Sequence, residues 1–189
     1  MTTVLVGGSA VFAGLCVACL VVLHVAPTGY SAVRNAVSEY GVGPYAKWYR
    51  AQATCAGIAA MLLAAALARA VDPAPRRVIV LLVVFALARF AITMYPMDLL
   101  GIAERTRTGV IHVLLAAIAF VSIAWAATAL RPWQHGLPAL GWAAGATALG
   151  TMLAVRNSTL RPALGLIERG FYASILAWLF VVAVRLATL

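Results

Sequence analysis

Six apolar stretches follow one another along this chain of 189 residues, and each is long enough to cross a lipid bilayer. An α-helix rises about 1.5 Å per residue, so about 20 apolar residues span the hydrocarbon core. Helices satisfy their own backbone hydrogen bonds, as lipid requires. The pattern predicts an all-α polytopic membrane bundle with transmembrane helices near residues 3–26, 50–71, 78–96, 109–130, 138–155 and 170–188.

The composition supports an integral membrane protein. Hydrophobic residues make up 65% of the chain and charged residues only 10%, whereas a soluble domain is about half apolar and a quarter charged. No stretch remains for a soluble domain, so residues 1–189 are expected to form one membrane-embedded domain. The net charge of +9 comes from basic residues in short loops and at helix ends. We expect membrane lipids as partners, no nucleic acid, and a multi-pass protein of the cell membrane.

Arg89 is the charge that the predicted bundle must accommodate, because it lies inside the apolar run 78–96 and no acid shares that run. A charge at membrane depth costs roughly 2.5–3.5 kcal/mol on insertion scales and rarely faces lipid. Arg89 therefore predicts a polar centre with a partner from another segment. The candidate counter-ions are Asp98, Glu39 and Glu168.

Six spans place both termini on one face, here called side A, and three longer connections on the opposite face, side B. Side A holds only Asp72 among the acids, and the others lie on side B: Glu39, Asp98, Glu104 and Glu168. Basic residues occur on both sides, so their count leaves the membrane orientation open. Side B is the expected functional side because it carries the long, acid-bearing connections.

The connection between the first two spans predicts a short interfacial helix, because Val33, Val37 and Tyr40 have helical spacing and Gly41 follows. Four aromatic side chains here are expected to form a belt at headgroup level: Tyr40, Tyr45, Trp48 and Tyr49. The pair Ser38-Glu39 either binds a polar head or caps a helix end.

The other side-B connections carry the candidate acid–base residues. Asp98 follows the proline that ends the third span, His112 lies about one turn inside the fourth, and His24 has a matching depth on the first. Histidine titrates near neutral pH, so such groups can act as acid and base, form a metal site, or only join helices. Glu168-Arg169 near the start of the last span either favours the helix dipole or holds a phosphate or carboxylate.

These residues define the predicted site. Asp98 or Glu39 is the expected acid or base, with His112 as its partner. The residues expected to bind substrate are Ser38, Arg89, Arg169, Tyr95, Glu168 and His24. No metal site is assigned, and the cofactor is left unknown. Gly141-x-x-x-Gly145 in the fifth span predicts close helix packing, either inside the bundle or across a homodimer.

Four motifs, taken in order, resemble a known group of bacterial and archaeal membrane proteins. They are Val37-Ser-Glu-Tyr-Gly41, Tyr95-Pro-Met-Asp98, Ile111-His112 and Gly165-Leu-Ile-Glu-Arg169. The set is similar to the signatures of the domain-of-unknown-function family 998, which implies a six-helix membrane protein with no assigned activity. The chain departs from that pattern at Tyr95, which replaces phenylalanine, and at Ala116, where a second histidine would stand.

Two functions are consistent with this pattern. The first is a membrane-embedded enzyme that acts by acid–base chemistry on a lipid or isoprenoid-type substrate. The alternative is a non-catalytic lipid-binding, transport or assembly protein that uses the same polar cluster. A third interpretation assigns the cluster only to holding the bundle together.

Overall fold

The computed structural model describes residues 1–99, 105–130 and 137–188, and these residues form helices without any strand. Glu104, which the sequence places on side B, lies outside the described residues. The six long helices are α1 Thr2–Val25, α2 Ala46–Ala70, α3 Arg76–Ile92, α4 Arg107–Ala129, α5 Leu137–Arg156 and α6 Leu164–Ala187. Two short 3₁₀ helices, η1 Val37–Gly41 and η3 Arg161–Ala163, precede α2 and α6.

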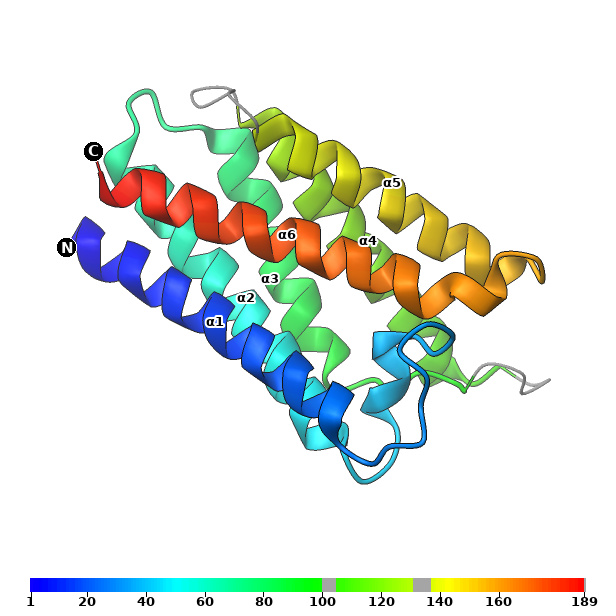
Figure 1. The fold of residues 1–189 in the computed structure, drawn as a ribbon. Helices are drawn as coiled ribbons and strands as arrows, with labels where there is room; N and C mark the ends of the chain where they lie inside the picture. Colours follow the sequence, from blue (N-terminus) through cyan, green and yellow to red (C-terminus); the bar gives the residue numbers. More distant parts are fainter. Residues whose placement is uncertain (100–104, 131–136, 189) are drawn as a thin grey trace.

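The long helices alternate in direction and form a closed ring. Each helix packs against its neighbour in sequence, and α6 completes the ring by packing against α1. The amino and carboxyl termini lie at the same end of the bundle, which is side A, and the segment before α2 folds over the opposite end (Figure 1). This arrangement confirms the all-helical fold of a multi-pass membrane protein.

Five of the described helices are long and apolar enough to cross a membrane, namely α1, α2, α4, α5 and α6. Helix α3 has 17 residues and ends at Ile92, four residues before the predicted end. It ends early because Thr93 Oγ1 donates a hydrogen bond to the Phe90 carbonyl, 2.7 Å away, and the chain then turns towards Pro96.

Small residues let the helices approach closely. A Cβ atom on Gly57 would lie 2.6 Å from the Phe90 ring, and one on Gly141 would lie 2.7 Å from the backbone nitrogen of Thr128 on α4. Gly141 therefore packs inside the bundle, whereas nothing lies within 4 Å of a Cβ placed on Gly145.

The segment before α2 is fixed to the start of α6. The Leu166 amide donates a hydrogen bond to the Val33 carbonyl at 3.0 Å, and Val37 is fully buried in the short helix η1. The predicted aromatic belt is wrong for Tyr40 and Tyr49, since they are only 2% and 3% exposed. Their rings pack inside the side-B end of the bundle, where the Tyr40 ring contacts the Tyr30 ring and the Tyr49 ring stacks on His112.

Candidate functional site

Arg89 is buried among neutral side chains. Its Nη2 donates to Gln52 Oε1 on α2 at 2.7 Å, and its Nη1 donates to the Tyr172 hydroxyl on α6 at 3.2 Å. Gln52 in turn donates to the Cys16 sulfur on α1 at 3.3 Å. The predicted counter-ions do not fill this role, because no described carboxylate hydrogen-bonds to Arg89. The network instead ties together four helices, α1, α2, α3 and α6.

Two further side chains near this network hold buried polar atoms that have no partner among the described residues. These atoms are the Tyr49 hydroxyl and His112 Nε2. Within the network itself, Arg89 Nε also lacks a partner among the described residues. The Tyr49 and His112 rings stack with centroids 6.3 Å apart. His112 Nδ1 lies 2.7 Å from the Tyr95 carbonyl, which can only accept, so Nδ1 carries the proton and Nε2 is the free acceptor of a neutral ring.

Asp98 organises the start of α4 rather than pairing with Arg89. Its carboxylate accepts hydrogen bonds from the Thr106 amide at 2.9 Å and the Thr106 hydroxyl at 2.7 Å. The same hydroxyl accepts from the Gly109 amide and caps the helix. A Cβ on Gly109 would lie 2.0 Å from the Asp98 carboxylate, so any larger residue here would displace that carboxylate. Both hydrogen bonds that described residues make to the Asp98 carboxylate come from Thr106, and neither comes from His112.

Arg169 lies at the centre of a second cluster, at the side-B end of α6. Its Nε donates to His24 Nε2 at 2.5 Å, and its Nη1 donates to the carbonyls of Asn35 and Gly165, both at 2.9 Å. Its Nη2 donates to the Tyr40 hydroxyl at 3.2 Å. Four of the five guanidinium N–H groups are thereby engaged by neutral groups, and one on Nη2 remains.

The acids beside this cluster hold the segment before α2. Glu168 is buried and accepts a 2.7 Å hydrogen bond from the Val37 amide. Glu39 is also buried, and its Oε2 accepts from the Ala36 amide at 2.9 Å and from Asn35 Nδ2 at 2.8 Å. Glu39 thus caps η1, which is one of the two roles that the sequence left open, while Ser38 is half-buried beside it.

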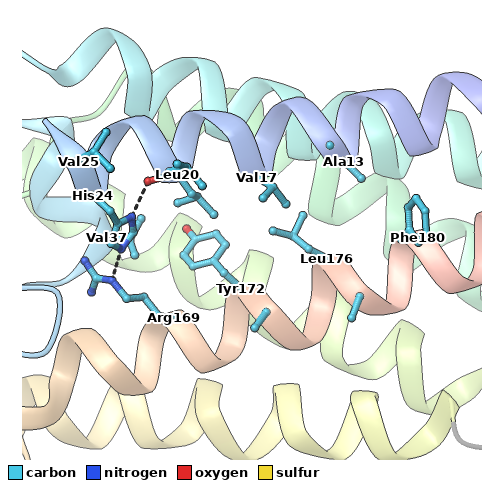
Figure 2. Close-up of a pocket in the computed structure, with 14 residues that line it drawn as sticks. Ala13, Val17, Leu20, His24, Val25, Val37, Arg169, Tyr172, Leu176 and Phe180 are labelled. Carbon is cyan, nitrogen blue, oxygen red and sulfur yellow. Dashed lines mark hydrogen bonds between the residues drawn. The ribbon is translucent and has the colours of Figure 1, made fainter.

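A groove of about 550 Å³ runs between α1 and α6 and ends at Arg169. Figure 2 shows its apolar walls, which include Val17, Leu176 and Phe180, and the dashed hydrogen bond from Arg169 to His24 at one end. The Tyr172 ring also lines this groove. Helices α1 and α6 therefore form an elongated apolar groove with a cationic end on side B.

The structure gathers some predicted site residues and separates others. His24 and Arg169 meet at the end of the groove, and Arg89 reaches the groove only through Tyr172. The three predicted catalytic residues, Asp98, His112 and Glu39, do not line it, and neither do Ser38, Tyr95 and Glu168. Within the described ranges, no three histidine, cysteine, aspartate or glutamate side chains are placed to hold a metal ion.

Sequence reasoning missed Gln52, Tyr172 and Asn35, and placed Tyr40 in the wrong surroundings. Gln52 is the one glutamine inside the predicted spans, which is a usable signal, since an amide buried in lipid needs a partner. Asn35 acts through its backbone carbonyl, so its side-chain chemistry carried no signal for the bond to Arg169.

Comparison with known proteins identifies the family of the chain and assigns no chemistry to it. A family model described as "Protein of unknown function (DUF998)" matches residues 10–185, which is nearly the whole chain. Neither the curated proteins nor the solved structures include a match to the chain.

Proposed function

We propose, for a chain that belongs to the DUF998 family of proteins of unknown function, that it binds a membrane amphiphile in the groove between α1 and α6. The observation that supports the proposal is a single groove of about 550 Å³ that has apolar walls and a cationic residue at one end. Such a volume falls in the range of small-molecule sites, about 300–1,000 Å³.

The apolar part of the groove suits one hydrocarbon tail. Its lining on α1 runs from Ala13 to Val25, which is about 18 Å at 1.5 Å per residue. On α6 the small side chains Ala173 and Ala177 leave room beside Leu176. An acyl or isoprenoid chain that lies along this path enters sideways from the bilayer, because the groove is on the outer face of the helix ring.

The polar end of the groove suits an acceptor-rich head. Among the described residues, no carboxylate hydrogen-bonds to Arg169, and one of its N–H groups has no partner. A phosphate or carboxylate head would supply both the acceptor and the compensating charge in one charge-assisted contact. His24 already accepts from Arg169 and fixes the direction of the guanidinium.

The membrane topology that we propose has six crossings in the cell membrane, with η1 at the side-B interface. Helix α3 is the sixth crossing. It packs between α2 and α4 along its length, and its 17 residues cover about 26 Å, close to the hydrocarbon thickness of about 30 Å. Its charged residue Arg89 is buried against other helices and not against lipid.

A second candidate function is acid–base catalysis on a lipid or isoprenoid substrate. The observation that favours it is the buried Nε2 of His112, a free acceptor without a partner among the described residues. The proposed acids Asp98 and Glu39 are already engaged by Thr106 and by the amide of Ala36. Binding therefore has the stronger support in the geometry.

Native mass spectrometry of protein purified from membranes tests the binding proposal. Ala177→Phe fills the groove, and we expect it to remove a lipid that co-purifies with the native chain. Ala143→Phe is the matched control, because Ala143 is exposed on α5 outside the groove.

Equal lipid retention by the Ala177→Phe variant and the native chain would overturn the proposal, and so would equal loss in the Ala143→Phe control. The identity of the released molecule separates the two functions. A lipid released chemically unchanged after incubation supports binding, whereas a converted lipid supports catalysis.

A further inference from the structure

A second cavity on side B has a different chemistry from the groove. It measures about 480 Å³ and is lined by Arg34, Asn35, Glu39, Ser158, Arg161 and Pro162. We propose that it binds a zwitterionic headgroup that carries both a phosphate and a protonated amine, of the phosphoethanolamine type. This inference does not rest on the α1–α6 groove, because the two cavities share no lining residue.

The walls of the cavity are held in place before any ligand binds. One wall is the segment before η1, where Asn35 Oδ1 accepts from the Ser31 amide at 2.9 Å and the Asn35 amide donates to the Ser31 carbonyl. The other wall follows α5, where Asn157 Oδ1 accepts from the Thr159 amide at 2.9 Å. The Leu166–Val33 backbone bond ties the first wall to α6. Fixed walls reduce the ordering that a ligand must supply.

The charges of the cavity match a zwitterion. Arg34 and Arg161 are both exposed, come from opposite walls, and present guanidinium groups suited to phosphate oxygens. Glu39 is only 4% exposed, and Asn35 Nδ2 and the Ala36 amide both donate to its Oε2. Its Oε1 receives neither bond, so it is the acceptor for an ammonium N–H.

A purely anionic or a quaternary head fits less well. A phosphate alone would place negative charge in the same cavity as the Glu39 carboxylate, and it would supply no donor to Glu39 Oε1. A trimethylammonium head has no N–H to donate to Oε1. The cavity is lined by the segment before α2 and by the connection from α5 to α6, which both lie at the side-B end of the bundle (Figure 1), and this position suits a lipid source.

The test measures binding of phosphatidylethanolamine, phosphatidylcholine and phosphatidic acid to the whole protein by native mass spectrometry, with soluble O-phosphoethanolamine as competitor. We expect the strongest retention for phosphatidylethanolamine. Arg34→Gln and Arg161→Gln should each weaken it about tenfold, the loss of one charge-assisted contact. Arg50→Gln is the matched control, since it removes an exposed arginine at the same end outside the cavity.

Glu39→Gln tests the ammonium contact separately. Glutamine can still accept from the Ala36 amide, so we expect the fold to persist while the preference for phosphatidylethanolamine over phosphatidylcholine disappears. Equal retention of the three lipids by the native chain would overturn the proposal, as would an equal loss in Arg50→Gln. Displacement by O-phosphoethanolamine shows that the head alone is recognised, and its failure shows that the acyl chains of a lipid source are also needed. Ala177→Phe should leave this binding intact, so failure here and failure of the groove are distinguishable.

Discussion

The bond between Arg89 and Gln52 makes a quantitative prediction about stability. Gln52→Leu removes the acceptor that lies 2.7 Å from Arg89 Nη2 and keeps the volume of the side chain nearly constant. The guanidinium is then left with Tyr172 as its one described hydrogen-bond partner. Arg89→Leu removes the charge itself and leaves Gln52 Oε1 and the Tyr172 hydroxyl without their donor.

The magnitude follows from the charge and the burial. A hydrogen bond to a charged group contributes about 1.5–3 kcal/mol in soluble proteins, and bonds between transmembrane helices contribute about 0.6 kcal/mol on average and at most about 1.7. The short distance and the charged donor place this bond at the upper end of the membrane range. We therefore expect Gln52→Leu to lower the free energy of unfolding by about 1.5 kcal/mol.

The double variant should be more stable than the sum of the single variants predicts. Arg89→Leu removes a charge whose insertion costs roughly 2.5–3.5 kcal/mol, and this gain offsets the two polar groups that it leaves unpaired. We expect Arg89→Leu to change the free energy of unfolding by about 0.5 kcal/mol or less, and the double variant to match it. The coupling energy is then about 1.5 kcal/mol, which is about tenfold in the unfolding constant.

Equilibrium unfolding of the purified protein in mixed micelles measures this cycle. Thr147→Val serves as the control, because the half-buried Thr147 hydroxyl bonds to the Ala143 and Ala144 carbonyls of its own helix and to no other described helix, so its effect should stay within about 0.6 kcal/mol. If the effects of the two single variants simply add, the bond contributes nothing and the reasoning is refuted.

Two further predictions concern backbone contacts. Gly141→Ala should destabilise the monomer by about 1–3 kcal/mol in thermal unfolding, because its Cβ would lie 2.7 Å from the Thr128 backbone. Gly145→Ala meets open space and should be neutral or slightly stabilising in the same measurement. A loss of dimer by both variants in cross-linking would instead support the predicted homodimer face. Asp98→Asn keeps one acceptor oxygen for Thr106, so we expect a loss of about 1 kcal/mol in unfolding free energy and unchanged lipid retention. Unchanged stability together with lost conversion of a lipid would support the catalytic role for Asp98.

Most of the fold could be predicted from hydropathy, because lipid requires long apolar helices and the short loops then fix an alternating bundle. The helix ends were less predictable. Helix α6 begins at Leu164, six residues before the predicted start, and Glu168 and Arg169 bond to the segment before α2. Charged residues near a predicted span end are normally assigned to the interface, and only the tertiary contacts show that these two also bond within the protein.

A polar cluster around Arg89 was predictable from the sequence, and its hydrogen-bond partners were not. Arg89 indicated a polar centre near side B, and one lies there. The sequence favoured carboxylate partners, because opposite charges are the first candidates for a buried cation. The structure uses an amide and a phenol, and the available acids bind backbone amides or Thr106. Pairings between distant segments depend on which helix faces meet, and a single sequence does not encode that directly.

Arg89 and Arg169 have different roles at the side-B end of the bundle. Arg89 is enclosed by neutral partners from other helices and does not line the groove, so its contacts hold the bundle together. Arg169 lines the groove, and one of its N–H groups has no partner among the described residues, so it is the cation of the groove that a ligand there can reach. Tyr172 connects the two, because its hydroxyl accepts from Arg89 while its ring forms part of the groove wall. The buried arginine therefore fixes the wall beside the half-buried Arg169, the cation that a ligand in the proposed site would meet, and this gives a reason for a charge at a depth where lipid disfavours it.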